Sequence, residues 1–103
     1  MEISFKKVPN FRKADIIPLA VCIHIGEGSQ DIIYQTFLTE EKSTHYIVGE
    51  KGIWQCVAEK DIAWAQGNVI RPTHSLVLNS DKNPNEYLLS IENEGFAYKD
   101  IPE

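Results

Sequence analysis

A histidine ends an apolar run near the start of the chain, and its position suggests chemistry. Residues 18–28 read PLAVCIHIGEG, which is apolar up to Ile25 and then continues with glycine and glutamate. In open α/β sheets, ligands gather beyond the carboxyl ends of strands, where His24 would lie. A neutral imidazole there can bind a metal ion or act as a general base. A hydrogen-bonded structural histidine is the alternative.

A pair of carboxylates near the end of the chain is the second candidate for chemistry. In YLLSIENEG (residues 87–95), strand alternation places Glu92 and Glu94 on one face, about 7 Å apart. The apolar residues beside them predict a central strand, in which a carboxylate is costly unless it has a role. Partial burial would raise the pKa of Glu92 toward neutrality, which suits proton transfer. A solvent-facing pair is the alternative.

Three further residues could lie near such a cleft. His45 begins another apolar stretch and could approach the cleft or be satisfied within the sheet, whereas His74 lies in a Pro/Asn-rich loop and is expected to be solvated. Trp64 is a large apolar side chain beside the flexible Gly67. The sequence contains no nucleophile elbow, P-loop, dinucleotide fingerprint or HExxH motif.

The elements that must position these residues follow from periodicity and turn signals. We expect an irregular segment over 1–18, a strand over 19–25 covered on both faces, a helix over 29–39, a hairpin over 44–59, a long loop over 68–86 and a strand over 87–95. This order predicts an α/β (α+β) fold in which a helix packs on a mixed central sheet of about four strands. Its 103 residues suffice for a single domain, 1–103.

Composition excludes several classes of function. The net charge of −5, without a cluster of Lys and Arg, argues against nucleic-acid binding, and no apolar run is long enough to span a membrane. The first residues lack the apolar core of a secretion signal, so we expect cytoplasmic synthesis. Cys22 and Cys56 both lie in apolar runs, which favours buried reduced thiols over a disulfide.

Four segments taken together resemble one family. The blocks CIHIGEGS, STHYIVGEKGIWQCVAEKDIAWAQGN and NPNEYLLSIENEG, with the loop NVIRPTHSLVLNSDKNPNEY, are similar to zinc-dependent N-acetylmuramoyl-L-alanine amidases of the type-2 amidase and peptidoglycan-recognition-protein superfamily. The likeness covers residues 19–95, and the middle block is its most specific part.

The resemblance implies a zinc-dependent peptidoglycan hydrolase. His24 would be the first zinc ligand, and Glu92 would accept the proton of the water that attacks the amide between N-acetylmuramic acid and L-alanine. Trp64 would line the peptidoglycan groove, and His45 would lie in the sheet near the zinc and contribute to substrate binding. Such a domain would act on peptidoglycan or muropeptide, as a phage endolysin, a bacterial autolysin or a muropeptide-recycling enzyme.

Two departures from the family pattern open alternatives. Ala65 stands where the family commonly has a histidine, and the family's second histidine and further Asp or Cys ligand, near the domain's end, have no counterpart here. We therefore expect an incomplete amidase domain with weak or absent zinc. The alternatives are a remnant that binds muropeptide without catalysis and a purely structural or oligomeric domain. A missing C-terminal helix would also leave an apolar sheet face open to self-association.

Overall fold

A five-stranded mixed sheet forms the centre of the protein. The computed structural model describes residues 2–66 and 82–96. The strands of the main sheet, in spatial order, are β1 (Ile3–Phe5), β5 (Gly52–Gln55), β4 (Tyr46–Gly49), β7 (Leu88–Asn93) and β3 (Ala20–Ile25). Strand β7 is parallel to both of its neighbours, β3 and β4, and β4 and β5 form an antiparallel hairpin. The expected α+β class with a mixed sheet is confirmed.

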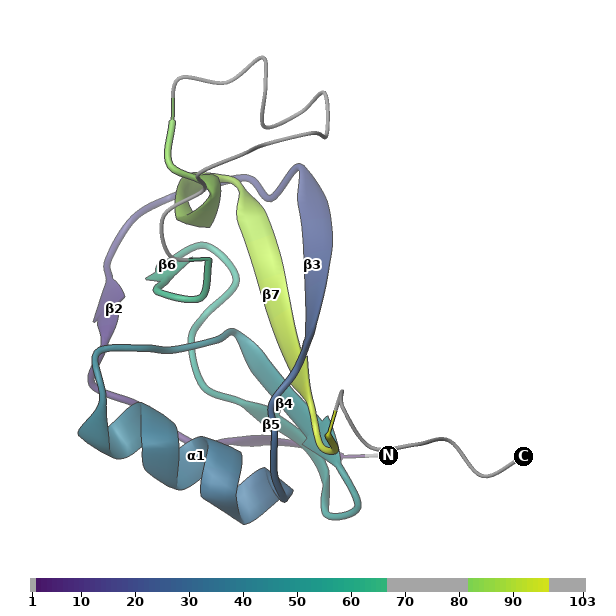
Figure 1. The fold of residues 1–103 in the computed structure, drawn as a ribbon. Helices are drawn as coiled ribbons and strands as arrows, with labels where there is room; N and C mark the ends of the chain where they lie inside the picture. The colour runs from purple at the N-terminus through teal and green to yellow at the C-terminus, as the bar shows by residue number, and fades with distance from the viewer. Residues whose placement is uncertain (1, 67–81, 97–103) are drawn as a thin grey trace.

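One helix and a small second sheet cover one face of the main sheet. Helix α1 (Gln30–Thr39) begins at Ser29, whose hydroxyl accepts a hydrogen bond from the Ile32 N–H. Strands β2 (Phe11–Arg12) and β6 (Ile62–Ala63) pair antiparallel and lie on the same side as α1 (Figure 1). The core lies between these layers.

The core is small and draws on every layer of the covered side. Its buried apolar residues are Val8, Ile33, Phe37, Ile47, Trp54, Cys56, Val57 and Ala63. Ile33 and Phe37 come from α1, and Ile47 and Trp54 are register partners on β4 and β5. The helix therefore packs on the sheet face to which Ile47 and Trp54 point.

The expected helix, the hairpin and the last strand are confirmed, while two other expectations are wrong. The segment 1–18 contains β1 and β2 instead of being irregular, so the main sheet has five strands where about four were expected. The strand over 19–25 forms as β3, but it lies at the sheet edge and exposes one face instead of being covered on both. Its continuous apolar run hides this alternation, because both its covered and its open positions carry apolar residues.

The loop expected over 68–86 lies mostly outside the described residues. Its end forms a short 3-10 helix, η1 (Pro84–Glu86), which Asn83 and Glu86 close with reciprocal side-chain to backbone hydrogen bonds. No helix among residues 2–66 and 82–96 is long and apolar enough to cross a membrane.

Candidate functional site

Glu92 and His24 lie side by side on the covered face of the sheet. They are register partners on the parallel strands β7 and β3, which are about 4.8 Å apart, and therefore point to the same side. Burial raises the pKa of the half-buried Glu92 carboxyl above its ordinary value, while the positive charges of His24 and Lys42 act in the opposite direction. Glu92 is thus a carboxylate held in a partly dry site between two basic side chains.

The ring of His24 is half-buried at the rim of this face. Its Nε2 atom lies 3.5 Å from the Sγ atom of Cys22, two residues earlier on the same strand face. The ring is therefore not enclosed in packed hydrocarbon. Both Cys22 and the deeper Cys56 are free thiols.

Three contiguous cavities run along the covered side past Glu92. The first, of about 440 Å³, lies beside β2 and β6 and shares Trp64 and Asn85 with the second, of about 420 Å³. The second shares Glu92 and Lys42 with the third, of about 240 Å³, between β3 and α1. We refer to this row of three adjoining cavities as the groove; Glu92 and Lys42 line both the second and the third of them.

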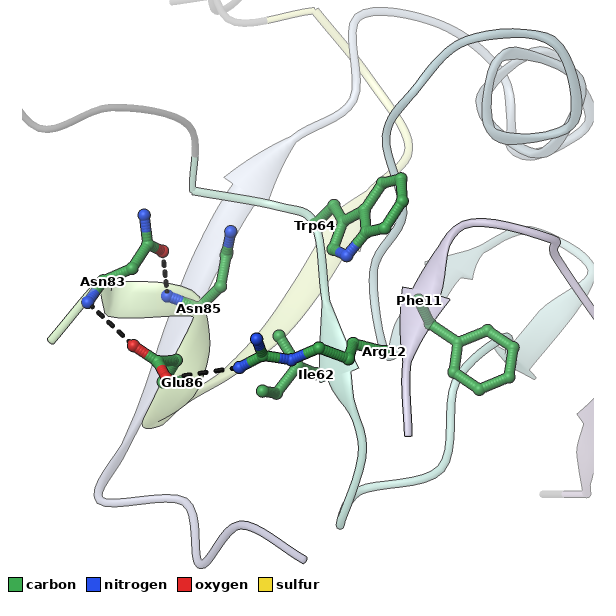
Figure 2. A pocket seen from close by; sticks show the side chains of 7 residues that line it. All are labelled: Phe11, Arg12, Ile62, Trp64, Asn83, Asn85 and Glu86. Atoms are coloured by element: carbon green, nitrogen blue, oxygen red, sulfur yellow. Dashed lines mark hydrogen bonds and ion pairs between the residues drawn. The ribbon is translucent and has the colours of Figure 1, made fainter. Parts of the chain in front are cut away.

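Figure 2 shows the first of these cavities, beside β2 and β6, which Glu92 does not line. Arg12 on β2 reaches Glu86 of η1 at 3.2 Å, so two segments far apart in the sequence are joined across the wall. The side-chain oxygen of Asn85 accepts hydrogen bonds from the backbone N–H groups of Ala65 and Gln66. These contacts hold β2 and the segment after β6 against η1.

Trp64 stands in the groove wall between the first two cavities. Its backbone is fixed on both sides, because its N–H donates to the Ser43 hydroxyl at 2.8 Å and its carbonyl accepts from the Ser43 N–H at 3.1 Å. Its side chain is 40% exposed, in contrast to the buried Trp54. A fixed backbone with an exposed indole suits contact with a ligand.

His45 lies in the interior and has no exposed surface. Its Nδ1 atom accepts from the Ser90 N–H at 3.1 Å, and its Nε2–H donates to the Asp61 carbonyl at 2.8 Å. Burial lowers the pKa of His45, while the hydrogen bond that its ring donates to the Asp61 carbonyl and the negative charges of Glu59 and Asp61 act to raise it. Both ring nitrogens are occupied, so in this conformation no His45 atom is available to a substrate.

The buried segment Ser43, Thr44 and His45 connects the parts of the site. Ser43 holds Trp64, while Thr44 and His45 both bond to Ser90, which lies two residues before Glu92 on β7. The positions of Trp64 and Glu92 are thus set by one polar cluster whose members are at most 1% exposed. His45 therefore contributes to the site by holding β7, and with it Glu92, in place.

Glu94 differs in role from its neighbour Glu92. Its carboxylate accepts from the N–H of Gln30, at the start of α1, at 2.7 Å and from the N–H of Glu50 at 3.0 Å. An anion at a helix N-terminus is favourable, so Glu94 ties the helix and the β4–β5 turn to β7. Only Glu92 of the pair faces the groove.

Several groove residues could not be recognised in the sequence. Lys42, Asn85 and Gln66 line the cavity beside Glu92. Lys42 lies outside the blocks that carry the resemblance, and Gln66 and Asn85 lie within them without having been singled out. Asn85 follows Asn83 and Pro84, which signals a turn but not a groove wall. His74 lies outside the described residues.

The described residues do not complete a metal site. Within 2–66 and 82–96, no group of three or more His, Cys, Asp or Glu side chains is placed to hold a metal ion. His24 has Cys22 and Glu92 as neighbours on the same face, but these three do not form such a group. Protein zinc sites need at least three ligands, so this part of the chain does not fit zinc by itself.

A comparison with family models identifies the chain's relationship. The model described as N-acetylmuramoyl-L-alanine amidase matches residues 13–103, which include β3, α1, the hairpin and β7. Comparisons with curated proteins and with solved structures gave no match. The match includes His24, Trp64 and Glu92, and the chain thus belongs to the N-acetylmuramoyl-L-alanine amidase family, whose activity is directed at peptidoglycan.

Proposed function

We propose that the groove binds a muropeptide and that Glu92 moves the proton during hydrolysis of the amide between N-acetylmuramic acid and L-alanine. The observation that carries this proposal is a half-buried carboxyl with a raised pKa at the junction of two cavities in one groove. In this reaction the carboxylate takes a proton from the attacking water and gives a proton to the departing amine of L-alanine. The C–N bond breaks, and the lactyl group becomes a carboxylate.

The groove offers polar and apolar contacts to such a ligand. Gln66 contributes a buried side-chain Nε2 donor that has no hydrogen-bond partner in the described part of the chain. An unpaired buried donor is costly, and if the Gln66 side chain turned toward the cavity that it lines, a peptide carbonyl of the ligand would satisfy it. Trp64 would contact a sugar or peptide face from the opposite direction, and its indole would become less exposed on binding.

Zinc enters this proposal through the family relationship. His24 is the residue that would serve as a ligand. Residues 2–66 and 82–96 contain no group of three ligands, so the remaining ligands would have to come from outside these ranges. That finding favours a second candidate function, namely a domain that binds muropeptide without turnover. The two candidates differ in metal content and in product release.

The deciding experiment uses a defined muramyl dipeptide, N-acetylmuramoyl-L-alanyl-D-isoglutamine, as probe. If the amidase proposal holds, metal analysis finds stoichiometric zinc and mass spectrometry detects the released alanyl peptide. We expect Glu92→Gln to reduce this release by at least about 100-fold, as for the loss of a general base. Probe binding without zinc or release would support the second candidate, and neither binding nor release would contradict both.

A matched control separates the proton-transfer role from a structural one. Glu94→Gln changes the carboxylate two residues away, which faces the helix N-terminus instead of the groove. We expect it to lower stability but to retain most of the rate. Trp64→Phe tests the groove directly, because the fluorescence change on binding should arise from this exposed indole and not from the buried Trp54.

A further inference from the structure

The main sheet has one face that no described element covers. Helix α1, β2 and β6 all lie on the opposite side (Figure 1). Register places five strongly exposed apolar side chains on this open face, on the two outer strands: Ile3, Phe5, Val21, Ile23 and Ile25. Their exposed fractions lie between 49% and 69%. The open face is therefore apolar at both of its borders.

The strands themselves contribute no charged side chain to the middle of the open face, where the Glu59 carboxylate, from the segment after β5, accepts a hydrogen bond from the Tyr46 hydroxyl. The strand register also shows which residues of the three inner strands point to this face. The apolar ones are Ile53, Val48 and Ile91, and the polar ones are Gln55, Tyr46 and Asn93. None of the residues assigned to this face by the strand register is Asp, Glu, Lys or Arg. In a chain with 24% charged residues, it is unusual that five strands contribute no charged side chain to one face of the sheet.

Such a face is unusual for a protein that stays alone in water. The largest apolar patch of a monomer is typically about 300–600 Å² and often functional. Sheets with parallel pairs, as between β3, β7 and β4, are normally covered on both sides. The open face thus has the composition of an interior surface.

We propose that the open face is the interface of a homodimer in which two copies of this chain pack sheet against sheet. Five strands of three to six residues, spaced about 4.8 Å apart with about 3.3 Å per residue, give a plane of roughly 360 Å². Protruding side chains enlarge this area, which stays below the roughly 800 Å² per partner of a standard interface and therefore fits a weak dimer that forms as the concentration rises.

Symmetry favours a second copy over an unlike partner. The net charge of −5 on each chain opposes self-association, and a contact through strands that carry no charged side chain keeps the negative charges of the two copies furthest apart. A two-fold interface brings the same patch from both copies together, and an apolar face is complementary to itself. The groove with Glu92 and Trp64 lies on the other side of each sheet and stays open in such a dimer.

Sedimentation velocity of the whole 103-residue chain from low to high micromolar concentration tests the proposal. We expect a concentration-dependent dimer that Ile23→Lys converts to a monomer, because this change buries a charge in the interface. The matched control is Ile17→Lys, a residue that is 82% exposed but lies outside the strands of the open face, and it should leave the dimer intact.

A milder variant keeps the test valid if Ile23→Lys does not fold. Val21→Thr keeps the side-chain shape and replaces a methyl group with a hydroxyl twice in the dimer, so we expect the dissociation constant to rise roughly tenfold. A monomer at every concentration, or a dimer unaffected by both variants, would overturn the proposal. So would a dimer whose β3 edge amides become protected from hydrogen exchange, because that pattern indicates edge pairing.

Discussion

The covered face of the sheet carries Glu92, His24 and Ser90, whereas the open face presents Ile3, Ile23 and other aliphatic side chains to solvent. The usual arrangement, with apolar residues inside and ionisable residues outside, is thus partly reversed within one sheet. On the covered side, polar groups are tolerated because hydrogen bonds satisfy Ser90 and His45 and because the groove admits water to Glu92.

This difference separates the two tasks that we propose for the chain. The covered face provides the shape and the chemistry of a ligand site, since α1 and β6 create a groove beside it. The open face provides mainly apolar area, with Gln55, Tyr46 and Asn93 as its few polar positions. Site and interface then share the central strands but not their side chains, because successive residues of a strand point to opposite faces.

The sharpest test of this comparison replaces one isoleucine on each face. Ile47 is 0% exposed beside Trp54, and Ile47→Ala should cost about 3–4 kcal/mol of unfolding free energy through lost burial and a cavity. Ile23 is 69% exposed, and Ile23→Ala should cost less than about 1 kcal/mol in the monomer. Urea denaturation below the concentration of association measures both, and equal losses would show that the open face is covered in the monomer.

A smaller loss of stability is expected at Gly26, which follows β3 and lies against the Ile33 side chain of α1. A Cβ atom at Gly26 would lie 2.2 Å from the Cδ1 atom of Ile33, a core residue that is 2% exposed and cannot move aside. Gly26→Ala should therefore cost about 1–3 kcal/mol, in the range of core overpacking. Because Gly26, Ile33 and Glu92 line the same cavity, the variant should also perturb the groove.

Gly28→Ala is the matched control for that variant. Its Cβ atom would lie 3.1 Å from the Cγ2 atom of Ile32, whose side chain is 58% exposed and free to shift. We expect a loss below about 1 kcal/mol. Thermal unfolding of both variants measures the difference, and a larger loss at Gly28 would contradict the packing described for α1.

Much of the fold could be predicted because local signals and packing agree. The Ser29 cap, the Gly49–Gly52 turn and the alternation over 87–95 each fix an element, and those elements are confirmed. Strand β1 could not be predicted, because within the described residues it pairs with β5. This parallel pairing joins Ile3 to Ile53, which are far apart in the sequence. Short strands held by such distant partners leave no periodic pattern.

The site could be predicted only in outline. The sequence places His24 and Glu92 on strands, but it does not show that these strands are parallel neighbours in register. The sequence left His45 either near the cleft or satisfied within the sheet, and its Ser90 and Asp61 partners place it in the interior. Lys42 and Asn85 reach the groove only through the tertiary arrangement of their loops.

The last prediction concerns the buried polar groups on the covered side of the sheet. We expect stability to depend on pH through His45. Burial lowers its pKa below 6.5 in the folded protein, so the unfolded chain binds a proton more readily. Stability is therefore complete above the unfolded pKa and falls as the pH drops from about 7 to about 5, by at most about 1.4 kcal/mol per pH unit. The raised pKa of Glu92 acts in the opposite sense, because it favours the folded protein at low pH. The contribution of His45 is thus isolated as the difference in slope between the wild type and His45→Gln in urea denaturation, and identical slopes would show that the ring does not remain neutral in the interior.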